Sequence, residues 1–129
     1  MILVDTSVWI DHLRSGSRTL TRLLERGAVL AHPWVVGELA LGHLSRRDQV
    51  IGLLSRLPQA TAATPTEVLT LIEHHELYGL GIGYVDAQLL AATKLTDGAT
   101  LWSNDRRLGA ATSRLGCAFD PRSDDKSET

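Results

Sequence analysis

The sequence has 129 residues, of which 43% are hydrophobic and 22% charged, the size and balance of one globular domain with its own core. Its formal net charge is −2, which excludes nucleic-acid binding by bulk positive charge but allows a local basic rim. The single cysteine, Cys117, excludes an internal disulfide, and no apolar run approaches the roughly 20 residues of a membrane-spanning helix. We therefore expect a cytoplasmic protein that does not span a membrane.

The first half of the sequence alternates short apolar runs with amphipathic segments. Residues 2–4 form an apolar run that predicts a buried strand. Asp5-Thr6-Ser7 then offers capping side chains for a helix that extends to Leu13. The next predicted elements are a helix over 20–26, a strand over 28–31, and a helix over 34–44 that follows Pro33. A β/α alternation begins here.

The second half continues this alternation. The sequence Thr64-Pro65-Thr66-Glu67 combines a capping box with a proline at the first helical position, so it predicts a helix that runs to Tyr78. The other predicted elements are a helix over 46–57, a short strand over 60–62, a helix over 85–95, a strand over 99–102, a helix from Asp105 onward and an edge strand over 117–119.

Strands separated by helices indicate parallel pairing through right-handed crossovers. We therefore predict an α/β fold, a three-layer α/β/α sandwich with a mostly parallel central sheet. No internal repeat or second domain is visible, so we expect one domain over residues 1–120. Residues 121–129 are polar and charged and are expected to fray as a C-terminal tail.

Two aspartates directly follow predicted strands. Asp5 comes after the strand over 2–4, and Asp105 comes after the strand over 99–102. Ligands of an open parallel sheet bind beyond the carboxyl ends of its strands. Both side chains are therefore expected to face one crevice.

Two further acids lie among apolar residues. Asp86 is in the first turn of a predicted helix and heads an apolar stripe that faces the core. Glu38 lies in the run 33–42, which contains no other charge and no basic partner at helical spacing. Carboxylates that converge on one crevice repel one another unless a cation compensates them. A cluster of Asp5, Glu38, Asp86 and Asp105 therefore predicts a divalent metal site.

The ligand types narrow the choice of metal. Carboxylate oxygens favour Mg²⁺ or Mn²⁺ over Zn²⁺, and no Cys or His spacing resembles a zinc site. His74 and His75 point about 100° apart on a helix and cannot easily share a metal, so we interpret them as solvated surface residues. A structural role remains open for each aspartate taken alone, because Asp5, Asp86 and Asp105 can all stabilise helix N-termini. Glu38, in mid-helix, caps nothing.

These residues also carry a resemblance to a known family. The sequence opens with Val4-Asp5-Thr6-Ser7-Val8-Trp9-Ile10-Asp11, places a lone Glu38 in an apolar helix, begins a helix with Asp86-Ala87 and sets Ser103-Asn104-Asp105 after a strand. In order and spacing, this pattern resembles the PIN domain of VapC toxins from bacterial VapBC toxin-antitoxin pairs. The resemblance extends from Ile2 to about Phe119.

The resemblance implies an Mg²⁺-dependent endoribonuclease, a homodimer, and a VapB-like antitoxin whose C-terminal segment covers the site. Carried over by position, Asp5 and Asp86 are the main metal ligands, while Glu38 and Asp105 complete the acidic pocket directly or through water. A metal held in this way lowers the pKa of bound water and neutralises charge on the leaving oxygen of a phosphodiester.

Other residues receive supporting roles from the resemblance. Thr6 and Ser103 are expected to supply hydroxyls beside the acids. Asp11 matches the opening motif, and its role stays open. Arg106 and Arg107, directly after Asp105, are candidates for contact with RNA phosphates, although exposed helix arginines without that duty fit equally well.

Two alternatives remain open. A phospho-acceptor receiver module also binds Mg²⁺ at strand ends, but it needs an acidic pair after the first strand and a lysine after a late one. Here Thr6 follows Asp5, and neither Lys94 nor Lys126 follows a predicted strand. The second alternative is a catalytically inactive PIN-fold interaction domain, against which the retention of all four acids weighs. The glycines at 79, 81 and 83 follow a helix and lack the spacing of a dinucleotide loop.

Overall fold

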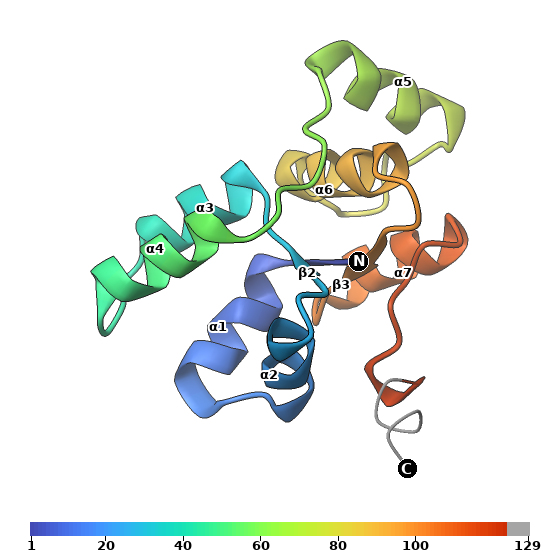
Figure 1. Cartoon of the computed structure of the whole chain (residues 1–129). Helices are drawn as coiled ribbons and strands as arrows, with labels where there is room; N and C mark the ends of the chain where they lie inside the picture. Colours follow the sequence, from blue (N-terminus) through green and yellow to red (C-terminus); the bar gives the residue numbers. More distant parts are fainter. Residues whose placement is uncertain (124–129) are drawn as a thin grey trace.

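A three-stranded parallel sheet lies at the centre of the protein, in the order β2-β1-β3 (Figure 1). The computed structural model describes residues 1–123. The strands are β1 (Ile2–Val4), β2 (Val29–Leu30) and β3 (Thr100–Trp102). In the register of the sheet, Leu3 of β1 stands between Leu30 and Leu101. The chain thus places its most apolar short runs side by side.

Helices cover both faces of this sheet. In Figure 1, α1 and α2 lie below the strands, whereas α6 lies above them with α5 outside it. The helices are α1 (Thr6–Ser15), α2 (Arg18–Glu25), α3 (Pro33–Ala40), α4 (Arg47–Arg56), α5 (Pro65–His74), α6 (Tyr84–Leu95) and α7 (Arg106–Arg114). This arrangement confirms the predicted three-layer α/β/α fold with a parallel sheet.

The burial pattern explains which helices lie inside. Leu3 and Val4 of β1 are completely buried because helices cover both faces of the strand. A strand covered in this way needs apolar residues at every position. In α6, all side chains from Ala87 to Thr93 are buried, so this helix is apolar on most of its circumference. The outer helix α5 buries only Val68 completely. The central sheet and α6 therefore form the buried core, and the ends of the strands are positioned by it.

Two predicted strands are reduced to isolated parallel bridges at the edges of the sheet. Residues 60–62 form no strand: the bridge beside them joins Ala31 and Gln59, and only the N–H of Ala60 continues the pairing, to the carbonyl of Ala31 at 2.9 Å. The chain turns away because the N–H of Thr61 donates to the Thr96 hydroxyl and not to a neighbouring strand. The segment over 117–119 likewise makes one bridge, between Leu101 and Ala118.

Two predicted helix ends are also wrong. The helix expected to reach Tyr78 ends at His74, because Glu76 adopts a left-handed conformation with φ 51°. The helix expected over 34–44 ends at Ala40, before Gly42. Residues 121–123 form a helical turn, and the remainder of the predicted tail lies outside the described residues. No helix within residues 1–123 is long and apolar enough to cross a membrane.

Candidate active site

The candidate site lies at the carboxyl edge of β1 and β3. Asp5 follows β1, and the Ser103-Asn104-Asp105 segment follows β3. The N–H of Asp5 donates to the carbonyl of Trp102 at 2.9 Å, which extends the pairing of these strands to the edge. In the order β2-β1-β3, the chain leaves β1 first toward one side and later returns on the other side. This edge is therefore the topological switch point, where open α/β sheets bind ligands.

Asp5 is held by two hydroxyl groups. Its Oδ2 accepts hydrogen bonds from Ser7 Oγ at 2.7 Å and from Ser103 Oγ at 2.8 Å. The side chain is only 5% exposed, and it makes no capping hydrogen bond to α1. Asp5 is thus the N-cap residue of α1 by position, but its side chain is not used as a cap. Within residues 1–123, its Oδ1 accepts no hydrogen bond.

Asp105 and Asp86 each use one oxygen at a helix N-terminus. Oδ1 of Asp105 accepts from the N–H groups of Arg107 at 2.9 Å and Leu108 at 3.1 Å and so caps α7. Oδ2 of Asp86 accepts from the N–H of Gly83 at 3.0 Å, just before α6. In the described part of the chain, the second oxygen of each aspartate has no hydrogen-bond donor. The structural role is real for both acids but occupies only half of each carboxylate.

Glu38 projects from α3 and is exposed. Its Oε1 accepts a hydrogen bond from the hydroxyl of Thr6 at 2.6 Å. Thr6 directly follows Asp5 in the sequence, so this contact joins Glu38 to the edge of the sheet. The resemblance expects a Thr6 hydroxyl beside the acids, and the structure places that hydroxyl on Glu38. Glu38 therefore reaches the site from the solvent side, and the apolar run around it packs the opposite face of α3.

The charges of the other three acids act on Asp86. Burial raises the pKa of Asp86, the hydrogen bond from Gly83 lowers it, and the negative charges of Asp5, Asp105 and Glu38 raise it further. No Lys or Arg among residues 1–123 forms an ion pair with any of these four carboxylates. The four predicted acids thus lie around one edge of the fold, and no ion pair within residues 1–123 compensates their negative charge.

The donor set fits a hard divalent cation. Each of the four carboxylates keeps one oxygen without a hydrogen-bond donor in the described residues, and carboxylate oxygens are the preferred ligands of Mg²⁺ and Mn²⁺. As placed, no three Asp, Glu, His or Cys side chains of residues 1–123 are close enough together to hold a metal ion. Like charges without a cation between them favour this separation.

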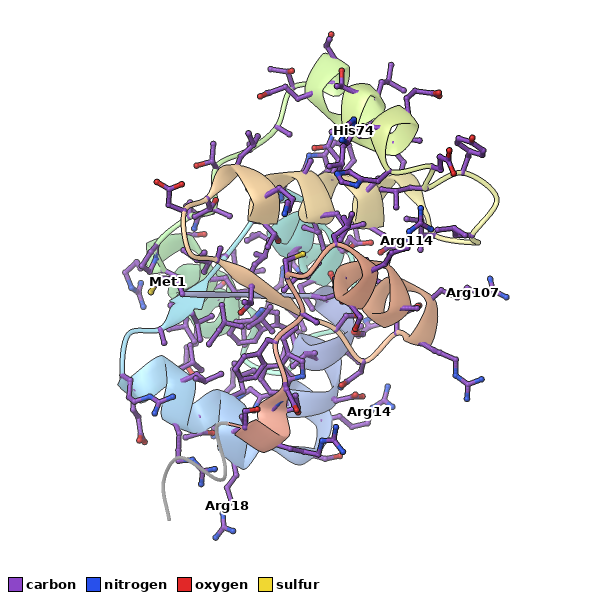
Figure 2. The ribbon with its side chains drawn as sticks, turned by 90° about the vertical axis from the view of Figure 1, so that its right-hand side faces the viewer. Met1, Arg14, Arg18, His74, Arg107 and Arg114 are labelled. Carbon is purple, nitrogen blue, oxygen red and sulfur yellow. The ribbon has the colours of Figure 1, made fainter. Side chains whose placement is uncertain are left out.

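Arg107 lies at the rim of the site. Its side chain covers Gly81, in the loop that leads to α6 and Asp86, with its Nη1 at 3.5 Å from the Gly81 carbonyl oxygen. A Cβ atom at Gly81 would come within 2.9 Å of the same Nη1, and Gly81 has φ 78°. Figure 2 shows Arg107 on the same side of the molecule as Arg14 of α1. Arg106 is exposed.

A groove of about 420 Å³ begins beside Glu38. Ile10 and Leu13 of α1 contribute partly exposed apolar side chains to it, and Arg14 adds a positive charge. The remaining lining residues are Glu38, Leu39 and the segment 42–45. The groove is therefore mainly apolar, and Glu38 is the one acid of the site that lines it.

Two parts of the site escaped the sequence analysis. Ser7 had been assigned only a capping function, yet its hydroxyl binds Asp5 and accepts from the N–H of Asn104 at 3.0 Å. Asn104 had no assigned role. A hydroxyl two residues after a strand-end aspartate is a usable signal for Ser7, whereas only the fold brings Asn104 to α1.

Comparisons with known proteins show the family of this chain. Residues 2–112 match the PIN domain family. Ribonuclease VapC32 of Mycobacterium tuberculosis, from the strains CDC 1551 / Oshkosh and ATCC 25618 / H37Rv, is 48% identical over 119 residues, which are 92% of this chain and 96% of the relative. The crystal structure of FitAcB from Neisseria gonorrhoeae has a TM-score of 0.64 and 19% identity, and the match covers 95% of this chain and 99% of that chain.

The structural likeness supports the fold, and the sequence likeness goes further. It confirms the predicted resemblance to VapC toxins and the prediction of a ribonuclease, and it removes the receiver-like alternative. The chain belongs to the PIN-domain family.

Proposed function

We propose that this protein is the toxin of a toxin-antitoxin pair and cleaves RNA with a divalent metal, Mg²⁺ or Mn²⁺, bound by Asp5, Glu38, Asp86 and Asp105. One observation carries the proposal. Each of these acids is fixed through one oxygen and keeps the other free within the described residues, and burial together with the negative charges of the other three acids raises the pKa of Asp86. A divalent cation relieves the repulsion among these charges.

The side chains around the metal have distinct tasks. Asp5 and Asp86 are the more buried of the four acids and are the main ligands. Glu38 and Asp105 are exposed and complete the pocket directly or through water. When bound, the metal lowers the pKa of a water molecule and stabilises charge on the leaving oxygen of the phosphodiester. The chain itself then needs no nucleophilic side chain.

The surrounding residues position the acids and the substrate. The hydroxyls of Thr6 and Ser103 orient Glu38 and Asp5 by the hydrogen bonds described above. Arg107 is held against Gly81 at the rim, where its guanidinium can bind an RNA phosphate through two donors. Arg106, on the exposed first turn of α7, is the second candidate for phosphate contact.

The partner proposed for the groove is the antitoxin. The groove is mainly apolar and is lined by Arg14 and Glu38, so it suits an amphipathic peptide segment that continues over the acids. A homodimer is a further part of the proposal. Trp34 is 45% and Leu41 is 91% exposed on α3 and its C-terminal end, and exposed apolar side chains of this size are typical of interfaces. We place the RNA substrate, and therefore the protein, in the cytoplasm.

The proposal is tested by incubating purified protein with total RNA in the presence of Mg²⁺, Mn²⁺ or EDTA. Cleavage is expected with either metal and not with EDTA. Asp5→Asn and Asp86→Asn are expected to abolish it, while Asp97→Asn is the matched control because Asp97 is exposed and remote from the site. Cleavage that survives EDTA or both substitutions contradicts the mechanism. An intact fold without cleavage under all conditions instead supports the inactive PIN-fold alternative.

A further inference from the structure

Asp11 and Asn104 join two segments that are far apart in the sequence. The side-chain amide of Asn104 donates a hydrogen bond from Nδ2 to Oδ2 of Asp11 at 2.7 Å. Asp11 lies on α1, while Asn104 lies in the segment between β3 and α7. Both residues are exposed, yet the contact is short and involves an ionised acceptor, which makes it stronger than a neutral hydrogen bond.

The same face of α1 holds Asn104 at a second point. Ser7 and Asp11 are four residues apart and therefore lie on one face of the helix. Ser7 Oγ accepts from the backbone N–H of Asn104 at 3.0 Å, while Asp11 accepts from its side chain. Backbone and side chain of Asn104 are thus both fixed to α1.

The protons of this network can be assigned without conflict. The hydroxyls of Ser7 and Ser103 each donate their single proton to Oδ2 of Asp5, at 2.7 and 2.8 Å. Each hydroxyl oxygen then accepts one backbone N–H: Ser7 from Asn104 at 3.0 Å and Ser103 from Asp105 at 2.9 Å. A displacement of Asn104 therefore alters both hydroxyls that orient Asp5 and the backbone that carries Asp105.

Asp11 itself stands outside the acidic site. The negative charges that raise the pKa of Asp86 are those of Asp5, Asp105 and Glu38. Oδ2 of Asp11 is occupied by the amide of Asn104. The negative charge of Asp11 thus faces a hydrogen-bond donor on the neighbouring loop.

We propose that Asp11 is a positioning residue for the ribonuclease site: it holds Asn104, and through Asn104 it fixes the loop whose hydroxyl and backbone orient Asp5 and Asp105. This inference rests on the proposed function, because it assigns Asp11 a part in the same reaction. It requires an acceptor at position 11 and does not require a charge there.

The variants separate positioning from metal or RNA contact. Asp11→Ala is expected to lower kcat by roughly three- to tenfold, the equivalent of one hydrogen bond, with little change in KM. Asp11→Asn keeps an acceptor oxygen and is expected to remain within about twofold of the wild type. Asn104→Ala should lower kcat as Asp11→Ala does, and the double variant Asp11→Ala/Asn104→Ala should be no worse than either single variant.

A second readout uses the metal-free protein. In Asp11→Ala, the backbone N–H groups of Asn104 and Asp105 should exchange with solvent roughly three- to tenfold faster by NMR, because their acceptors lose a fixed geometry. The N–H of Leu20, which donates to the Ser17 hydroxyl at the start of α2, is the internal control and should not change. Asp11→Asn should leave all three rates near those of the wild type.

Several outcomes overturn the inference. If Asp11→Asn is as impaired as Asp11→Ala, the charge of Asp11 acts directly and not through Asn104. If the losses of the two single variants multiply in the double variant, the residues act independently. Unchanged exchange of Asn104 and Asp105 in Asp11→Ala also contradicts it. Failure of the proposed function looks different: either Asp86→Asn cleaves RNA like the wild type, or no variant cleaves RNA. In both cases the exchange rates of Asn104 and Asp105 still test the link from Asp11 to Asn104.

Discussion

The acidic site has two sides, and they are held in different ways. On the β1–β3 side, Asp5 is buried and its Oδ2 receives two hydroxyl donors, which in turn accept backbone N–H groups. On the α3–α6 side, Glu38 and Asp86 each accept one hydrogen bond, from Thr6 and Gly83. A network with shared members resists displacement more than isolated bonds do. The comparison teaches that the sheet edge sets the position of the site, while α3 and α6 supply acids with more freedom to adjust around a metal.

The largest effect is expected from Asp86→Asn. Loss of this ligand should lower kcat/KM by about 1000-fold or more, about 4 kcal/mol in the barrier. The melting temperature of the metal-free protein should instead rise. Because burial and neighbouring charges raise the pKa of Asp86, its ionised form opposes folding at neutral pH, so the neutral side chain should raise Tm. A lower Tm in metal-free buffer would show that Asp86 is a structural acid.

A smaller effect distinguishes the two sides directly. Ser103→Ala removes one donor to Asp5 and the acceptor of the Asp105 N–H, so it should lower kcat by about tenfold and stability by about 1–2 kcal/mol. Thr6→Val removes the single contact to exposed Glu38, where water can substitute. It should lower kcat by about threefold and stability by less than about 0.5 kcal/mol. Kinetics and chemical denaturation measure both, and equal losses would refute the difference between the sides.

The smallest effect concerns acidification of the α3 side. His32 is fully buried at the N-cap of α3, and its Nδ1 accepts the N–H of Trp34 at 3.1 Å. Burial holds the pKa of His32 below its ordinary value. As the pH falls, the imidazole of His32 therefore takes up its proton in the unfolded chain before it does so in the folded protein. The contribution of His32 to the free energy of unfolding is constant above about pH 6.5 and decreases below it, until the folded-state pKa is reached.

His32→Asn is the matched variant for this pH dependence, because asparagine caps helices without titrating. The drop in Tm between pH 7 and 5 should be smaller in His32→Asn than in the wild type. Part of the drop should remain, since burial also lowers the pKa of His12 and His75. An identical pH profile in both proteins would show that His32 does not contribute.

Much of the frame could be predicted from the sequence. The apolar runs that end at Asp5 and at Ser103 are short and continuous, as strands covered on both faces must be, and each leads directly into a polar segment. Asp86 and Asp105 could be predicted in the same way, because each lies at the start of a helix. Position in the chain was enough for these residues, because the strand ends of a parallel sheet share one edge.

The remaining features depend on contacts between distant segments. The strand expected over 60–62 is lost because the Thr96 hydroxyl captures a backbone N–H, which no local pattern reveals. The link from Asp11 to Asn104 spans 93 positions, and the contact between Thr6 and Glu38 spans 32. Local propensity cannot predict such partners, since they exist only after the helices have packed on the sheet.

The central claim is that the four carboxylates bind one divalent metal ion, from the β1–β3 side and from the α3–α6 side. Calorimetric titration of metal-free protein with Mn²⁺ tests it most directly, with Asp5→Asn from one side, Asp86→Asn from the other and Asp97→Asn as the control. We predict that the wild type and Asp97→Asn bind Mn²⁺ alike and that either site variant weakens binding by at least about tenfold, since each loses a charged ligand. Unchanged Mn²⁺ affinity in both site variants would contradict the account.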